Sequence, residues 1–109
     1  MTDPYQLLDN VIAELIHELK QLGYWAEQTP DEQALNSSLP FCIDTLEFEQ
    51  WLQFVLIPKL ILLSEKKHRL PAKANIHPVA EEVLKQRDEN TSFLLTLIQK
   101  IDHLSGRLI

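Results

Sequence analysis

The sequence is dominated by one long apolar stretch, Leu39 to Ser64, which reads LPFCIDTLEFEQWLQFVLIPKLILLS. Two dense apolar runs meet within it at Pro58 and Lys59. At the 100° per residue of an α-helix, the segment from Phe48 to Leu56 places its aromatic and aliphatic side chains on one broad face. A face this wide indicates a helix that is covered on more than one side. We therefore expect this stretch to form the central helix of the fold.

Length and composition limit what can surround this helix. A chain of 109 residues can bury a core within one domain, so we assign residues 1–109 to a single domain. An apolar content of 45% argues against disorder, and only two glycines argue against a turn-rich β protein. We predict an all-α fold, a compact and mostly antiparallel bundle of four to five helices around a proline-interrupted central helix.

The start and the interruption of the central helix are both predicted from local residues. Asp44 followed by Glu47 is typical of an N-terminal capping box. Pro58 has no backbone N–H, and its ring crowds the carbonyl group four residues earlier. We therefore expect the helix to kink or restart near Leu56 and Ile57.

Two helical patterns precede the central stretch. Apolar residues recur at helical spacing from Pro4 to Leu22, where Thr2 or Asp3 can cap the helix and Gly23 can end it. The following segment is polar and holds one short helical candidate, residues 29–35, with Thr29 as its cap. These patterns predict one outer helix with a single buried face and one helix of a turn or two.

The C-terminal third predicts two more helices. Leu70-Pro71 and the following segment to Ile76 predict an extended loop, because the residue before a proline is pushed out of the helical region, and Asn75 or His77 can cap the next helix. Polar residues 88–92 would interrupt the buried face of that helix. We therefore favour a break there and a separate last helix to about Leu104, with one continuous helix as the alternative.

The charges are unevenly distributed along the chain. Residues 1–54 carry ten acids and one base, a balance of −9, whereas residues 55–109 carry nine bases and six acids, a balance of +3. Such a basic segment is either a solvated helix end or a docking patch for an acidic partner or RNA phosphates. The overall charge of −6 disfavours direct RNA binding. The bases of this patch are Lys59, Lys66, Lys67, Arg69 and Lys73.

No residue pattern predicts a catalytic, metal or cofactor site. Glu14 with His17 and Glu65 with His68 have the Glu-x-x-His spacing of di-iron bundles, but the first pair lies far from its helix's apolar face and the second lies in a basic helix end. Cys42 precedes a helix start, yet no histidine is near it in sequence, which favours a buried structural thiol. We therefore expect a protein that is not an enzyme and that needs no metal or cofactor.

The same composition indicates a compartment. A single cysteine cannot form an internal disulfide, and the N-terminal residues lack the basic start and apolar run of a signal peptide. The longest apolar run is shorter than the ~20 residues of a membrane helix. We expect a cytoplasmic protein that does not bind a membrane.

The order of these features resembles a known family. The stretch LPFCIDTLEFEQWLQFVLIPKL, followed by RLP and then HPVAEE, is similar to the YqcC-like family of small bacterial proteins over nearly the whole chain. The resemblance implies a compact helical bundle without an established activity. Some members carry the label tRNA pseudouridine synthase C. This chain lacks the length and the mixed α/β pattern of such an enzyme, so the label suggests that the enzyme is a partner and does not imply the same catalytic activity.

The first functional hypothesis is therefore an interaction module. It would bind a protein partner or form a homodimer, through the basic patch and a strip on the outer side of the central helix. An accessory factor for a tRNA-modifying pseudouridine synthase and a bundle that binds a small ligand are the alternatives. The strip comprises Leu46, Gln50, Gln53 and Ile57, and packing alone accounts for neither glutamine.

Overall fold

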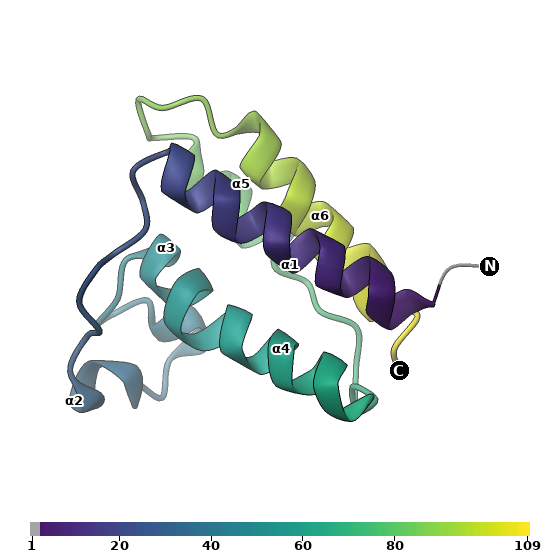
Figure 1. Cartoon of the computed structure of the whole chain (residues 1–109). Coiled ribbons are helices and arrows are strands. Elements are labelled where there is room, and N and C mark those ends of the chain that lie inside the picture. Colours follow the sequence, from purple (N-terminus) through teal and green to yellow (C-terminus); the bar gives the residue numbers. More distant parts are fainter. Residues whose placement is uncertain (1–2) are drawn as a thin grey trace.

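The computed structural model describes residues 3–109, and within that range all regular structure is helical. Helix α1 runs antiparallel to α6 on one side of the molecule and antiparallel to α4 on the other (Figure 1). Counting α3, a π-helical segment and α4 as one continuous rod gives five helices, as predicted. The helices are α1 (Pro4–Gln21), α2 (Glu32–Leu35), α3 (Phe48–Trp51), the π segment (Leu52–Leu56), α4 (Ile57–Lys66), α5 (His77–Leu84) and α6 (Ser92–Ser105), with a short 3-10 turn at Pro40–Cys42.

Helix α1 follows its sequence signals closely. The carboxylate of Asp3 accepts a hydrogen bond from the backbone N–H of Tyr5 at 2.9 Å, which caps the first turn. Thr2, the other predicted cap, lies outside the described residues. Gly23 has a φ of +77°, the left-handed conformation that ends a helix with least strain when no Cβ is present. The helix is confirmed to within one residue at its C-terminal end.

The central rod begins later than predicted. Asp44 does not cap it: its carboxylate accepts a hydrogen bond from the hydroxyl of Ser37 instead. The capping residue is Glu47, whose backbone N–H donates to the side-chain oxygen of Gln50 at 2.8 Å. Asp31 likewise replaces Thr29 as the cap of α2, because its carboxylate accepts from the backbone N–H of Ala34 at 2.7 Å.

The predicted interruption of the rod takes the form of a π-helical turn. The backbone N–H of Ile57 donates to the carbonyl of Leu52, five residues earlier, and the helix then continues through Pro58 to Lys66. The π turn lies directly before the proline, where the ordinary four-residue pattern would lose a donor. Residues 48–66 thus remain one rod.

Helices α5 and α6 are separate, so the single long helix considered as an alternative is wrong. The side-chain oxygen of Asn90 accepts from the backbone N–H of Ser92 at 3.0 Å and thereby helps to start α6. Neither Asn75 nor His77 caps α5 with its side chain. That role falls to Asp102 of α6, a buried carboxylate that accepts hydrogen bonds from the backbone N–H groups of Ile76 and His77 at 2.8–2.9 Å.

The core lies between α1, α6 and the central rod. The apolar face of α6 is buried along its whole length, and Val11 belongs to the buried face of α1. In residues 3–109 no helix has both the length and the apolar character needed to cross a membrane. The fully buried large side chains are Leu8, Leu15, Leu19, Leu52, Leu84, Leu94, Leu97, Ile98 and Ile101.

Candidate protein-binding groove

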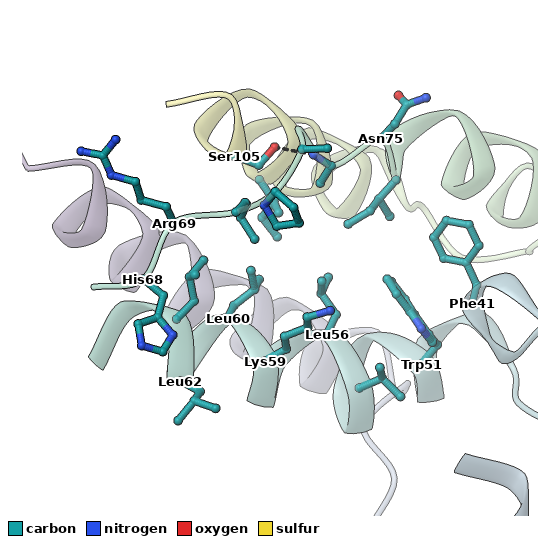
Figure 2. Close-up of a pocket in the computed structure, with 18 residues that line it drawn as sticks. Phe41, Trp51, Leu56, Lys59, Leu60, Leu62, His68, Arg69, Asn75 and Ser105 are labelled. Atoms are coloured by element: carbon teal, nitrogen blue, oxygen red, sulfur yellow. Dashed lines mark hydrogen bonds between the residues drawn. The ribbon is translucent and has the colours of Figure 1, made fainter. Parts of the chain in front are cut away.

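An open groove of about 640 Å³ lies between the central rod and residues 68–76, the segment that joins α4 to α5 (Figure 2). The rod supplies one wall and the joining segment supplies the other, and side chains of α6 contribute from behind. Most lining residues are apolar. They are Phe41, Trp51, Val55, Leu56, Lys59, Leu60, Leu62, Leu63, His68, Arg69, Leu70, Pro71, Ala72, Ala74, Asn75, Ile76, Ile101 and Ser105.

One end of the groove is aromatic. Phe41 and Trp51 meet edge to face with ring centroids 4.8 Å apart, and Phe48 stacks beneath Trp51 at 6.1 Å. Phe41 has a φ of +60°, and Cys42 a φ of +49°, left-handed conformations that cost a residue with a Cβ roughly 1–2 kcal/mol. The short turn thus directs the Phe41 ring to the groove at an energetic cost. Trp51 is half-buried, so it packs on the core and also lines the groove.

Phe41 is followed by the buried thiol of Cys42. Its sulfur lies 3.8 Å from the backbone carbonyl oxygen of Leu35, and the side chain is 6% exposed. This burial confirms the prediction of a buried cysteine.

The π turn fixes the middle of the rod wall. Gln53 leaves the rod on the side away from the solvent and is only 7% exposed. Its amide forms two hydrogen bonds with the backbone of Ala26, one from the N–H and one to the carbonyl, both at 2.8 Å. These bonds tie the rod to the segment that follows α1. Val55 and Leu56 of the same π turn line the groove.

The opposite wall is held in place by α6 and the C-terminal residues. The backbone N–H of Leu70 donates to the carbonyl of Leu108 at 2.7 Å, and that of Ala74 donates to the hydroxyl of Ser105 at 2.8 Å. Asp102 fixes the end of the wall at Ile76. Residues 68–76 contain no regular helix or strand, yet these hydrogen bonds shape the groove before anything binds.

The basic residues of the sequence patch are divided by the structure. Lys59 and Arg69 line the groove, and neither forms an ion pair within residues 3–109. Lys67 instead faces the start of α1, with its ammonium 3.6 Å from the carboxylate of Asp3 and 4.9 Å from the ring centre of Tyr5.

The other two predicted bases lie outside the groove lining. Lys66 is exposed at the end of α4. The methylene groups of Lys73 lie beside Gly106, at the end of α6. The five bases therefore do not form one continuous site.

The predicted outer strip of the central helix does not exist. Leu46, Gln53 and Ile57 are 8%, 7% and 3% exposed, and Gln50 is half-buried and caps the rod. The expectation failed because the rod begins at Phe48 and contains a π turn, so a regular 100° spacing from Leu46 misplaces these side chains. Each glutamine has a structural role that the sequence pattern did not reveal.

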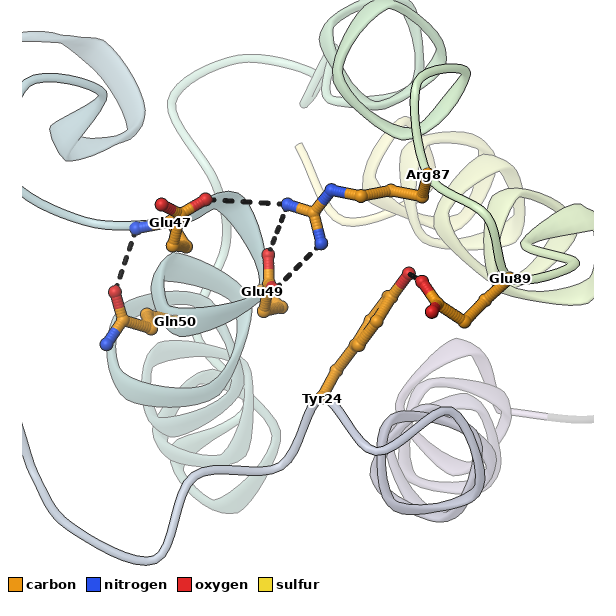
Figure 3. Close-up of polar contacts among 6 residues, drawn as sticks. All are labelled: Tyr24, Glu47, Glu49, Gln50, Arg87 and Glu89. Atoms are coloured by element: carbon orange, nitrogen blue, oxygen red, sulfur yellow. Dashed lines mark hydrogen bonds and ion pairs between the residues drawn. The ribbon is translucent and has the colours of Figure 1, made fainter.

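Outside the groove, a cluster of polar side chains joins α3 to the α5–α6 connection (Figure 3). Arg87 forms two hydrogen bonds of 2.8 Å with the carboxylate of Glu49, and its guanidinium lies 5.3 Å from the ring centre of Tyr24. The Tyr24 hydroxyl donates to Glu89 at 2.6 Å. The pairing accounts for a charged residue, Glu49, beside the apolar face of the central helix.

The cluster shifts the pKa values of its members. Burial acts to raise the pKa of Glu49, but the hydrogen bonds from Arg87, with a backbone hydrogen bond, outweigh it and leave that pKa below its ordinary value. The hydrogen bonds with Glu49 raise the pKa of Arg87. Burial, followed by the hydrogen bond to Glu89, raises the pKa of Tyr24. This pattern is that of a structural ion pair, which ties α3 to the other half of the molecule.

In the part of the chain from residue 3 onward, no three histidine, cysteine, aspartate or glutamate side chains lie close enough together to bind a metal ion. His77 and Glu81 do form the small pair that their spacing suggests, with 3.0 Å between Nδ1 and Oε1 at the start of α5. Only the imidazole of His77 is largely covered, and the carboxylate of Glu81 is exposed. The arrangement stabilises the first turn of α5.

These features define a class of protein: a small all-helical bundle with an open, preformed apolar groove. A family model described as tRNA pseudouridine synthase C (DUF446) matches residues 7–104. The chain belongs to this family, which confirms the predicted YqcC-like membership.

Similar proteins come from several bacteria. An uncharacterised protein of Haemophilus influenzae is 39% identical over 80 residues, 73% of this chain and 76% of the relative. The uncharacterised protein YqcC of Escherichia coli is 33% identical over 86 residues, 79% of both chains. The solution NMR structure of Escherichia coli YqcC has a TM-score of 0.85 at 27% identity and covers 99% of this chain and 92% of that chain.

A different kind of match comes from Pectobacterium carotovorum. A protein named tRNA pseudouridine synthase C is 38% identical over 53 residues, which are 49% of this chain but only 14% of that protein. The similar segment there is part of a much longer chain.

Proposed function

We propose that this protein is a non-enzymatic interaction module that binds a protein partner in the groove between the central rod and residues 68–76. The observation that carries the proposal is a preformed apolar groove with two cationic side chains, Lys59 and Arg69, that have no ion-pair partner in residues 3–109. We further propose that it acts in the cytoplasm, where a reduced Cys42 is stable.

Apolar burial supplies the driving force for such a complex. Covering the groove would remove Leu62, Val55 and the exposed face of Trp51 from water, at about 25 cal/mol per Å² of apolar surface. Aromatic anchors such as Phe41 and Trp51 are typical of binding hot spots. Because both walls are already fixed by hydrogen bonds, little ordering entropy opposes association. A volume of 640 Å³ also suits a small ligand, but the groove lining extends along the rod from Trp51 to Leu63, which favours a peptide segment.

The proposal is tested with two neighbouring residues of α4. Leu62 is 50% exposed and lines the groove, whereas Ile61 is 38% exposed and does not. The tagged full chain, Leu62→Glu and Ile61→Glu are each purified from the native cell, and co-purifying proteins are quantified by mass spectrometry. We expect a partner that is captured by the wild type and by Ile61→Glu but at least about tenfold less by Leu62→Glu, because covering a carboxylate at an apolar contact costs free energy of desolvation.

Self-association is measured on the same samples. The interaction module would be contradicted if the protein is a monomer at high concentration in sizing experiments and no co-purifying protein is missing specifically from the Leu62→Glu sample. A dimer that Leu62→Glu dissociates and Ile61→Glu does not would identify a second copy of this chain as the partner.

A second candidate function is that of an accessory factor for a tRNA pseudouridine synthase. The observation that favours it is the Pectobacterium carotovorum protein of that name, in which a segment similar to this chain belongs to a longer protein. Domains that are joined in one protein often act on a common task when they occur as separate chains, so the enzyme itself is a candidate partner. The family description agrees with this association.

This second function is tested with purified components. A separate tRNA pseudouridine synthase C is mixed with the wild type, Leu62→Glu and Ile61→Glu, and complex formation is followed by sizing. Direct tRNA binding is measured at low and moderate salt with the wild type and with Lys66→Glu/Arg69→Glu. Binding through phosphates must weaken steeply with salt and with this charge reversal. The absence of both a complex and tRNA binding at low salt would rule out the accessory role.

A further inference from the structure

We propose that the occupant of the groove is an amphipathic helix of about three turns that carries an acidic residue near one end. This inference rests on the proposed binding function and specifies the chemistry of the partner. It draws on three features of the groove: the length of its rod wall, the state of the backbone in the other wall, and the difference between its two ends.

The length of the rod wall matches a short helix. Lining residues run from Trp51 to Leu63, so at about 1.5 Å per residue this wall is about 18 Å long. A partner helix of three turns is about 16 Å long and presents apolar residues at positions i, i+3 or i+4, and i+7 along one side. Two or three such anchors would contact the strip formed by Trp51, Val55 and Leu62.

The opposite wall disfavours an extended peptide. A peptide that adds as a strand needs free backbone donors and acceptors along the edge it joins. The N–H groups of Leu70, Ala74 and Ile76 already donate to Leu108, Ser105 and Asp102, and Pro71 has no N–H, so this wall offers no continuous series of free donors. An extended segment would therefore place unpaired backbone groups over an apolar floor, whereas a helix satisfies its own backbone.

The two ends of the groove differ in charge. Phe41 and Trp51 form an apolar end, while His68 and Arg69 lie at the other end with Lys59 along the rod between them (Figure 2). Lys59 and Arg69 have no carboxylate partner in the described part of the chain, residues 3–109. An acidic residue of the partner at the end next to His68 and Arg69 would complement the positive charge of that end and would fix the direction in which the helix lies (Figure 2).

A peptide selection tests the inference. A display library of random 16-residue peptides is selected on the full-length protein, and bound peptides are tested for loss of binding to Leu62→Glu but not to Ile61→Glu. Synthetic peptides from that set are titrated into a Trp25→Phe variant, in which Trp51 is the remaining tryptophan and reports on the groove. Circular dichroism follows the conformation of the bound peptide.

Charge recognition is tested with matched neutral variants. Lys59→Gln/Arg69→Gln removes the two groove cations, and Lys66→Gln/Lys100→Gln removes two exposed lysines that do not line this groove. We expect selected peptides to share helical apolar spacing and an Asp or Glu near one end, and to gain helix on binding. Their affinity should fall about fivefold for the groove pair, as expected for one partly exposed ion pair, and stay within about twofold for the control pair.

The outcomes separate this inference from the function it rests on. Groove-binding peptides that lack acidic residues, bind both neutral variants equally or stay extended would overturn the acidic helix but leave groove binding intact. A selection that yields no peptide sensitive to Leu62→Glu would overturn both.

Discussion

Asp102 is the residue on which both the fold of α5 and the shape of the groove depend most directly. Its carboxylate is 8% exposed and accepts hydrogen bonds from the backbone N–H groups of Ile76 and His77 at 2.8–2.9 Å. A negative charge at this position also interacts favourably with the N-terminal end of the helix dipole. We therefore expect Asp102→Ala to be one of the most destabilising single substitutions outside the apolar core.

The magnitude follows from the number of lost contacts. Hydrogen bonds to a charged group are worth about 1.5–3 kcal/mol each, and the relief of burying a carboxylate offsets part of that loss. We expect Asp102→Ala to lower the free energy of unfolding by about 2–4 kcal/mol. Asp102→Asn should cost less than Asp102→Ala, about 1–2 kcal/mol, because the amide keeps one acceptor oxygen. It should not be neutral, because its NH₂ group would face a backbone N–H.

Urea unfolding followed by tryptophan fluorescence measures these changes. With a slope of about 2 kcal/mol per molar urea, Asp102→Ala should move the midpoint down by about 1–2 M without changing the slope. Gln99→Ala, an exposed substitution on the same helix, is the matched control and should stay within about 0.5 kcal/mol. A cost below about 1 kcal/mol for Asp102→Ala, or a larger cost for Asn than for Ala, would refute this reasoning.

Three further predictions concern other parts of the fold. The pKa of Glu49 is lower in the folded protein than its ordinary value of 4.5, so its contribution to stability is present above about pH 4.5 and is lost as the pH falls below that value. Glu49→Gln should therefore flatten this part of the curve when the free energy of unfolding is measured against pH. An unchanged curve would contradict the role of Arg87. Gln53→Ala should cost about 1–3 kcal/mol in urea unfolding, because it leaves the backbone groups of Ala26 without partners, whereas Gln53→Glu should retain only the contact with the N–H. Gly23→Ala should cost about 1 kcal/mol from its φ of +77° alone, since a Cβ there meets open space; a neutral result would show that the turn relaxes.

The sequence was most informative where helical structure depends on local residues. Helix α1 begins directly after its cap, Asp3, and ends before Gly23, and both signals lie within a few residues of the ends they determine. The buried face of α6 follows from the regular spacing of Leu94, Leu97 and Ile101. In these helices the side-chain period and the local caps agree, so one pattern specifies both extent and orientation.

Predictions failed where the determining partner is distant in sequence. The cap of α5 is Asp102, 26 residues from Ile76, and the partner of Gln53 is Ala26, 27 residues away. Neither contact leaves a periodic signal. The π turn added a further error, because it shifts the side chains of the rod relative to a regular helix. The groove depends on the same long-range contacts, and for this reason the sequence indicated an outer strip instead.

The cost of ordering explains why these distant contacts matter for binding. Fixing the backbone of one residue costs about 1–2 kcal/mol, so ordering nine residues such as 68–76 at the moment of association would require about 10 kcal/mol or more. Here folding has already fixed that segment, through hydrogen bonds from Leu70, Ala74 and Ile76 to the C-terminal part of the chain. Two anchors of the groove, Asp102 behind one wall and Gln53 behind the other, are thus structural residues that lower the entropic cost of binding. Neither side chain lines the groove, so a substitution at Asp102 or Gln53 removes no direct contact with a partner. It should still reduce partner affinity, because part of the wall would then have to be ordered on binding.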